Sequence, residues 1–169
     1  SGHIARGMTT PTPISRGEFG IVGASRILPL LQTQKIPTTW FIPGFTIETY
    51  PEACTEVVEG GHEIAHHGWT HVQPALLDRA QEESEMIRAN DAIAQLCGRR
   101  AQDHRSPAWD LSPHTLELLI QHDFYYESSM MGHDYSPYRV RQGDVIELQK
   151  PMQFGDKTPL IEMPISWYQ

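Results

Sequence analysis

The chain has 169 residues, of which 39% are hydrophobic and 20% are charged, and its net charge is −8. This balance predicts a single globular domain over residues 1–169 with a substantial core. The 13 basic residues are scattered, which argues against nucleic acid or an anionic membrane as a partner. No apolar run is long enough to predict a membrane span. Cys54 and Cys97 lie far apart in apolar patterns, which indicates core residues in a reducing compartment and a cytoplasmic protein.

The first predicted elements are a loop, a helix and a strand. Residues 7–17 are rich in Pro, Thr, Gly and Ser and predict an exposed loop. Residues 24–34 have a helical pattern in which Pro29 belongs near the first turn or at a kink. The run at 38–44 is β-branched and aromatic and stops at a Pro-Gly pair, so it predicts a buried parallel strand.

The middle of the chain continues this alternation. Acidic residues near its start and two glycines after its end predict a short helix over residues 50–61, followed by a strand over residues 62–67. The clearest helix covers residues 76–97, where apolar residues recur at helical spacing and Gly98 marks the C-terminal stop.

The last third combines one helix with three strands. Ser112 as N-cap and Pro113 at the first helical position predict a helix over residues 112–122. The predicted strands are residues 124–129, 145–149 and 160–166. We interpret residues 131–140 as a loop, either a lid over a site or a surface segment that contacts another subunit.

Strand–helix alternation on this scale predicts an α/β fold with a parallel sheet or barrel. In such folds the site lies where the strands end and the following loops begin. Residues 67–71, 105–109 and 128–131 each follow a predicted strand, so we expect them to converge there.

Four histidines fall within GGHEIAHHGWTH, residues 60–71. His62 and His66 complete the pattern His-Glu-x-x-His, which is typical of zinc proteases when it lies on a helix. Two glycines precede His62, and they suit the end of a helix better than its start. A zincin-type protease is therefore the weaker interpretation.

His67 and His71 form a second pair with the same spacing at the end of a predicted strand, where Gly68 permits a sharp turn. Neutral imidazoles are common ligands of zinc and similar ions. We predict a metal site here, with surface or hydrogen-bonded core histidines as the alternative. Catalytic zinc usually takes a third protein ligand as well.

The same stretch resembles the histidine motif of the polysaccharide deacetylase (NodB-homology, carbohydrate esterase 4-like) superfamily, and RSPAW at 105–109 resembles its Arg-x-Pro motif. ISRGEFG, WFIPGFTIETYPEA, YESSMM and IEMPISW extend the resemblance over nearly the whole chain. The chain is most similar to the intracellular branch, which contains peptidoglycan deacetylase-like proteins, cyclic imide hydrolases and allantoinases. The resemblance implies an incomplete (β/α) barrel that lacks its first strand and its C-terminal part in this chain.

The resemblance also implies residue roles. His67 and His71 match the metal ligands, and Arg105 matches a residue that orients the catalytic base. A surface ion pair is the alternative for Arg105, and a place in the core is the alternative for Trp109. The predicted substrate-binding residues, which would form a small aromatic-lined pocket, are Trp69, Pro107, Trp109 and Tyr138.

In this family, aspartates supply the third metal ligand and the general base, and we expect them upstream of Ser1, so that this chain alone lacks the catalytic aspartate. The general-acid histidine is expected beyond Gln169. We predict a metal-dependent hydrolase of non-peptide C–N bonds, with Zn²⁺ as the expected ion, that removes N-acetyl groups or opens small cyclic amides or imides. Its substrate would be a glycan or small-molecule amide, and we expect a homo-oligomer. The alternative is a non-catalytic barrel that binds sugar or metal.

Overall fold

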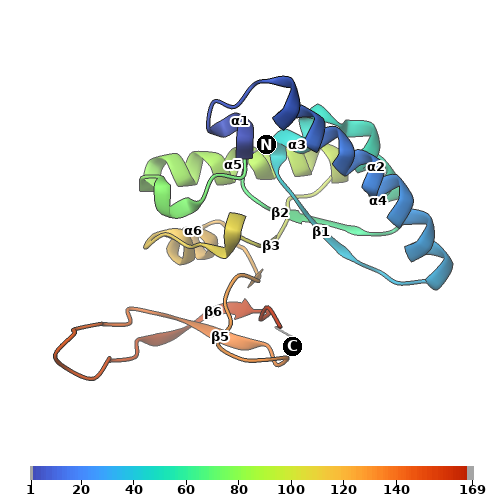
Figure 1. The fold of residues 1–169 in the computed structure, drawn as a ribbon. Coiled ribbons are helices and arrows are strands. Elements are labelled where there is room, and N and C mark those ends of the chain that lie inside the picture. Colours follow the sequence, from blue (N-terminus) through green and yellow to red (C-terminus); the bar gives the residue numbers. More distant parts are fainter. Residues whose placement is uncertain (1, 167–169) are drawn as a thin grey trace.

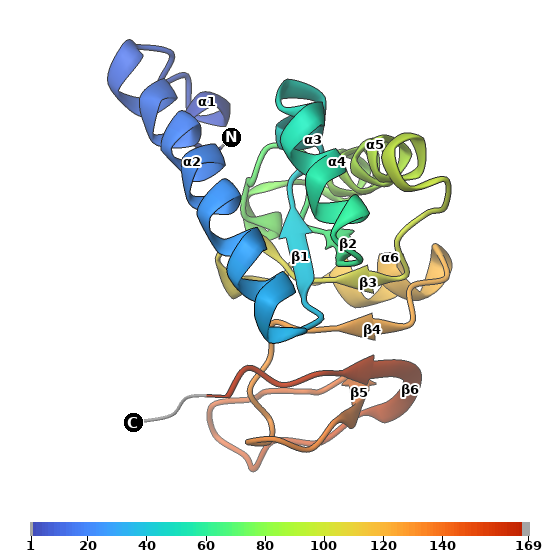
Figure 2. The same ribbon diagram turned by 90° about the vertical axis from the view of Figure 1, so that its right-hand side faces the viewer.

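The computed structural model describes residues 2–166 and has a six-stranded sheet at its centre, in the order β1-β2-β3-β4-β6-β5. Figure 2 shows the strands following one another from β1 to the β5–β6 hairpin. Neighbouring strands are parallel except for β5 and β6, which are antiparallel. The strands are β1 (Thr39–Ile42), β2 (Glu63–His66), β3 (Asp103–His104), β4 (Tyr126–Glu127), β5 (Tyr138–Gln142) and β6 (Asp156–Glu162). The helices are α1 (Gly2–Ala5), α2 (Pro11–Gln34), α3 (Gly44–Thr49), α4 (Pro51–Glu59), α5 (Arg79–Cys97) and α6 (Thr115–Gln121), with 3₁₀ turns η1 (Pro74–Leu76) and η2 (Pro107–Trp109).

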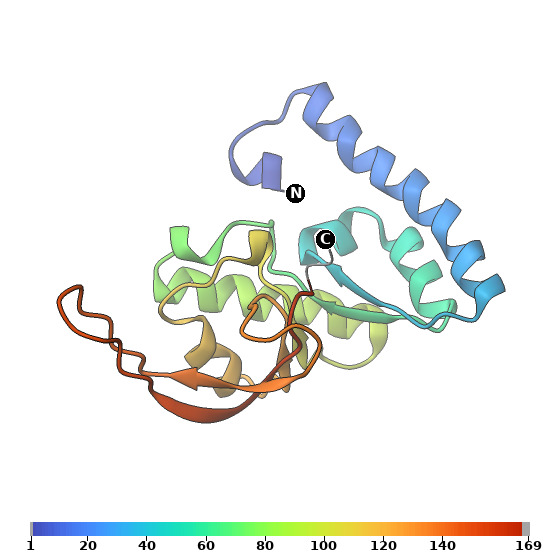
Figure 3. The ribbon, with the colours of Figure 1, turned by 60° about the horizontal axis from the view of Figure 1, so that its bottom comes forward.

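The N-terminal part corrects a prediction, because most of the expected loop at 7–17 is helical. Helix α2 begins at Pro11 and includes the predicted helix at 24–34 as its second half. A proline in the first turn of a helix loses no hydrogen bond, since the first N–H groups have no partner within the helix. Composition alone therefore mistook a helix start for a loop. Figure 3 shows α2 along the outside of the molecule, beside α4.

The middle of the chain confirms the expected alternation of strands and helices. β1, α4, β2 and α5 occupy the predicted segments within a few residues at each end. Helix α5 starts with a capping box, in which Asp78 accepts the backbone N–H of Gln81 and Gln81 accepts that of Asp78. This reciprocal pair satisfies two backbone donors at the helix start. Gly98 ends the helix in the left-handed conformation, with φ of 73°.

Two apolar clusters attach the helices to the sheet. The first joins β1 and β2 to α3, α4 and α5, and its buried members include Ile47, Val57 and Ile93. Cys54 is buried there as a free thiol, which confirms its predicted place in the core. The second cluster joins α5 and α6 to β5 and β6 through residues such as Leu118 and Leu160. Together the clusters fix the helices against the strands that carry the loops.

The last third contains two more corrections. The predicted strand at 145–149 is absent except for a single bridge from Val145 to Gln153, because this segment belongs to the long connection between β5 and β6. Figure 1 shows that connection projecting from the molecule. Part of the predicted loop at 131–140 is instead the start of β5, which pairs antiparallel with β6. Helix α6 begins at Thr115, although Ser112 still accepts the N–H groups of His114 and Thr115.

Among the described residues, no helix is both long and apolar enough to span a membrane. The parallel arrangement of β1, β2, β3, β4 and β6 brings their carboxyl ends to one edge of the sheet. We refer to this edge as the carboxyl end and to the opposite edge as the amino end. The predicted site residues follow β2 and β3, apart from Tyr138, which starts β5 opposite the last residue of β6, so the topology gathers them at the carboxyl end.

Candidate functional site

His67 is the first residue after β2, and its ring is held by the first residue after the neighbouring strand β3. Its Nδ1 lies 2.7 Å from the backbone oxygen of Arg105. Because a carbonyl only accepts, Nδ1 carries the hydrogen, and the lone pair of the ring is left on Nε2. Burial lowers the pKa of His67 to about 4 and outweighs this hydrogen bond. His67 is therefore neutral at physiological pH, as a metal ligand must be.

His71 lies beside His67 because the backbone turns sharply between them. Gly68 has φ of 68° and His71 has φ of 61°, both in the left-handed region. The two ring centroids are 4.8 Å apart and the planes meet at 74°. Burial is also the main cause that lowers the pKa of His71. Two neutral imidazoles thus lie next to each other at the carboxyl end.

A glutamate on α5 fixes the turn that joins the two histidines. One carboxylate oxygen of Glu85 lies 3.2 Å from the backbone nitrogen of Trp69 and 3.2 Å from that of Thr70. Both groups donate, so the carboxylate closes the turn in the manner of an anion at consecutive N–H groups. The sequence does not predict this role of Glu85, because no local pattern links it to a histidine motif about 15 residues earlier in the chain.

Arg105 follows β3 and is anchored on both sides. Its Nε donates to the backbone oxygen of Ser128 at 2.8 Å and its Nη2 donates to the Ser128 hydroxyl at 2.6 Å. The guanidinium also lies over the ring of Phe41, 4.5 Å from the centroid. Arg105 is not a surface ion pair. It is a fixed cation whose backbone oxygen holds His67.

The remaining predicted residues are placed in different surroundings. Pro107 is fully buried and packs against Gly68, so it supports the histidine turn. Trp109 is 41% exposed and follows the same strand as Arg105. Trp69 is 4% exposed within the first core cluster, where Arg88 covers one ring face at 3.7 Å. Tyr138 lies on the edge strand β5, with its hydroxyl accepting the N–H of Gly132 at 3.0 Å. The four residues do not form one aromatic pocket.

The pattern His62-Glu-x-x-His66 is not a zincin site, which corrects that interpretation. Both histidines are on or next to strand β2, so about 13 Å of extended backbone separates them. His62 Nδ1 is 3.0 Å from the Thr38 hydroxyl, and His66 Nε2 is 3.1 Å from the backbone oxygen of Met86. The two rings have separate structural partners.

A cavity of about 210 Å³ opens beside His71. Its walls include His71, Arg6 and Ala108, which come from the histidine turn, the loop after α1 and the loop after β3. A cavity of this size suits a small polar group such as an acetamido substituent better than a long ligand.

The histidine pair fits a divalent metal ion by its chemistry. Both rings are neutral, and His67 donates its other ring N–H to a carbonyl, which is the usual outer partner of a metal-binding histidine. Within residues 2–166 no cluster of three or more His, Cys, Asp or Glu side chains is arranged for a metal. The two histidines would supply two ligands, and a third would come from outside the described residues.

Buried polar side chains form a row across the carboxyl end, with one member on each of four neighbouring strands. His66, His104, Glu127 and Glu162 are register partners on β2, β3, β4 and β6, and each is at most 3% exposed. The rings of His66 and His104 are 5.2 Å apart, and His104 Nδ1 is 3.3 Å from Glu127. No local pattern predicts this row, because each member lies on a different strand and only the register brings them together.

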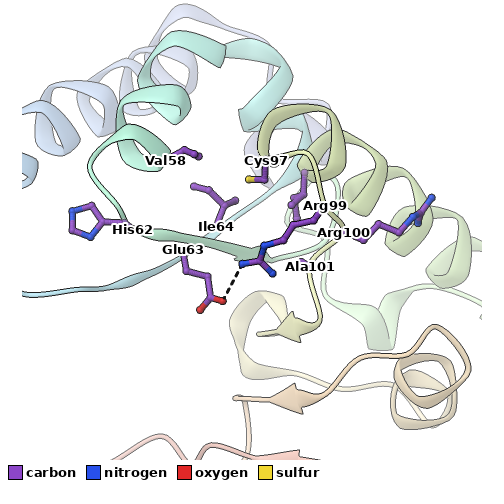
Figure 4. Close-up of a pocket in the computed structure, with 9 residues that line it drawn as sticks. Val58, His62, Glu63, Ile64, Cys97, Arg99, Arg100 and Ala101 are labelled. Carbon is purple, nitrogen blue, oxygen red and sulfur yellow. Dashed lines mark ion pairs between the residues drawn. The ribbon is translucent and has the colours of Figure 1, made fainter.

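The amino end of the sheet has a smaller cavity, of about 110 Å³. Figure 4 shows Arg99 reaching toward Glu63, at 3.7 Å, while Arg100 points away from it. Both arginine side chains are more than half exposed, and Arg100 pairs with Asp91. Its charged groups are exposed surface pairs, so this cavity is a poor candidate for a site.

The mainly parallel sheet, with paired histidines and an anchored arginine at its carboxyl end, is the arrangement that the sequence motifs predict for a NodB-type domain. A model of the polysaccharide deacetylase family matches residues 22–126, which is more than half of the chain. The chain belongs to the polysaccharide deacetylase family.

The chain is 38% identical, over 96% of its length, to a peptidoglycan deacetylase from Helicobacter pylori, of which it covers 59%. It is 32% identical to a Mycobacterium smegmatis protein assigned to the polysaccharide deacetylases, with a TM-score of 0.76 over 98% of this chain and 52% of that one. An allantoinase shares the fold, with a TM-score of 0.68 and 24% identity over 86% of this chain and 44% of that one. The predicted α/β fold is confirmed, and the chain spans about half the length of these relatives.

Proposed function

We propose that the natural protein containing this chain is a metal-dependent hydrolase of non-peptide C–N bonds that removes N-acetyl groups from a glycan. The contact between His67 Nδ1 and the Arg105 carbonyl carries this proposal, since it joins the two family motifs and leaves Nε2 free beside His71. Similarity to a peptidoglycan deacetylase favours a glycan substrate.

His67 and His71 would hold the metal ion together with a carboxylate from outside the described residues. A divalent ion such as Zn²⁺ held there would polarise an amide carbonyl and would lower the pKa of water toward about 7. The chain's own residues have the roles of holding and orienting. His67 is oriented by the Arg105 carbonyl, and the histidine turn is closed by Glu85.

Arg105 would orient the general base. Its guanidinium is fixed by Ser128 and by Phe41, so it offers a cation with little freedom to move. A cation within a few ångströms favours the charged form of a carboxylate, which keeps a general base ready to accept a proton. The cavity beside His71 would accommodate the acetamido group, with Arg6 and Ala108 in its wall.

Opening of a small cyclic amide or imide is the less favoured substrate class. That chemistry was expected from an aromatic pocket containing Trp69 and Tyr138. Trp69 lies in the core and Tyr138 lies on the edge strand, so neither supports a closed aromatic site around the histidines.

The test is an assay of the full-length natural protein with Zn²⁺ on N-acetylglucosamine oligomers, a succinimide-type ring and allantoin. We expect free amine from the oligomers, loss of activity after chelation, and recovery when metal is returned. Turnover of the succinimide-type ring or allantoin without turnover of the oligomers would reject the glycan substrate in favour of a small cyclic amide or imide. Binding of oligomers without turnover of any substrate would establish the non-catalytic alternative.

A further inference from the structure

Glu127 and Glu162 are two fully buried carboxyl groups on adjacent strands. They are direct register partners on β4 and β6, and both are 0% exposed. Two side chains at such positions point to the same face and lie in contact across a parallel pair. Neither group belongs to the proposed metal site or lines the cavity beside His71, so their burial needs a separate explanation.

The two carboxyls fix the loop that follows β4. Glu127 accepts the backbone N–H of Ser129 at 2.7 Å and also its hydroxyl. Glu162 accepts the backbone N–H of Met130 at 2.9 Å. Three donors from two consecutive residues thus converge on this pair, which sets the path of residues 128–130.

That loop is the anchor of Arg105. The backbone oxygen and hydroxyl of Ser128 accept the guanidinium, and the Ser129 hydroxyl accepts the backbone N–H of Ser106 at 2.8 Å. A displacement of the loop would therefore move the arginine side chain and the backbone around it together.

One proton resolves the electrostatics of the pair. Two adjacent carboxylates that are both fully buried cannot both keep their charge. One oxygen of Glu162, Oε2, has no donor within the described part of the chain, so it gains a partner when it carries a proton and donates to Glu127. Burial, followed by the hydrogen bond and charge of Glu127, raises the pKa of Glu162. Burial opposes the charge of Glu127, but its contacts with His104, Glu162 and Ser129 lower the pKa of Glu127.

We propose that Glu127 and Glu162 share one proton and act together as positioning residues for Arg105, with Glu127 as the carboxylate and Glu162 as the neutral donor. This inference rests on the proposed function, because Arg105 has a catalytic task only there. Loss of the shared proton would place two charges side by side, loosen the loop at 128–130 and release the guanidinium.

Other titratable groups face the pair. His104 on β3 contacts Glu127, and His66 on β2 stacks on His104. Tyr138 on β5 is the register partner of Glu162. A pH effect belongs to the carboxyl pair only if it changes in a Glu162 variant that leaves these three residues intact.

The first test is kinetic and uses the full-length protein loaded with Zn²⁺. Glu162→Gln keeps the acceptor for Met130 and a donor for Glu127, so kcat at neutral pH should stay close to that of the parent while the alkaline loss of kcat weakens. Glu127→Gln removes the carboxylate and should lower kcat on the order of 10²-fold with little change in KM, because misplaced groups cost mainly in the reaction step. Combined with Arg105→Lys, Glu127→Gln should cost almost nothing further.

The second test needs no activity. Infrared spectra should show the C=O stretch of a protonated carboxyl at neutral pH, absent from Glu162→Gln. Its absence from the parent protein would overturn the inference, as would additive effects of Glu127→Gln and Arg105→Lys or identical pH profiles of parent and Glu162→Gln. If Glu127→Gln fails to fold, the infrared band and the Glu162→Gln profile still decide. If the infrared band is present but the protein deacetylates no substrate, the shared proton of Glu127 and Glu162 is supported and the proposed function is rejected.

Discussion

The two ends of the parallel sheet hold their polar side chains in different ways. At the carboxyl end, His67 and Arg105 bind backbone oxygens at 2.7 and 2.8 Å in partly buried surroundings. At the amino end, Arg99 pairs with Glu63 at 3.7 Å with 65% of its side chain exposed. Partly buried, well-directed hydrogen bonds fix a side chain, whereas an exposed ion pair is screened and interchanges with water. The difference favours the carboxyl end as the place of the proposed function and a structural role for the amino end.

The largest expected effect comes from removing the first histidine of the pair. His67→Ala removes one of two metal ligands, so we expect the full-length protein to lose bound metal and to lose about 10³-fold in kcat/KM. The measurements are metal analysis and the oligomer assay. His62→Ala is the matched control at the other end of β2, and it should retain both metal and activity. The reverse pattern would restore the zincin interpretation.

Arg105 gives the next largest effect. Arg105→Lys keeps the charge but loses the two-point contact with Ser128, so we expect a loss on the order of 10²-fold in kcat with bound metal unchanged. Steady-state kinetics and metal analysis check it. A lysine variant with full activity would mean that the anchored geometry is irrelevant.

At the amino end we expect an effect on stability instead of activity. Burial, with the charge of Glu63 acting in the same direction, raises the pKa of Asp103 from 3.8 to about 6. The folded state then binds this proton more tightly than the unfolded chain, so the contribution to stability is present below about pH 4 and is lost as the pH rises through 6. Asp103→Asn should raise the free energy of unfolding at pH 7 by about 1–3 kcal/mol and change it little near pH 4. Urea unfolding at both pH values measures this.

Glu85 tests whether the histidine turn needs its carboxylate. Glu85→Gln keeps one acceptor for the amides of Trp69 and Thr70 but removes the charge, so metal affinity should fall about 10-fold. Titration with Zn²⁺ measures the affinity. Glu83→Gln on the same helix, whose partners are Arg79 and His122, is the control and should bind metal as the parent does.

The smallest effect is expected for Arg99. Arg99→Ala breaks an exposed pair at the amino end, so the free energy of unfolding should change by less than about 0.5 kcal/mol and kcat/KM by less than about twofold. A tenfold loss of activity in this variant would show that the cavity at this end takes part in function.

The sequence by itself determined the family, the strand–helix alternation and the two motifs at the carboxyl end. Apolar periodicity and glycine positions are local signals, and they located β1, β2 and α5 correctly. The same local signals failed at Pro11, because prolines in the first turn of a helix resemble those of a loop. They also failed at 145–149, where residues that favour strands belong to the connection between β5 and β6.

Only the tertiary structure decided which polar groups meet. The contact of His67 with Arg105 crosses 38 residues, and the pairing of Glu127 with Glu162 depends on strand register. The sequence predicts Trp69 as a pocket residue because its neighbours along the chain are the predicted metal ligands, yet its ring lies in the core. The direction of a side chain depends on the face of the element that carries it and on what packs there, and neither is encoded within a short stretch of sequence.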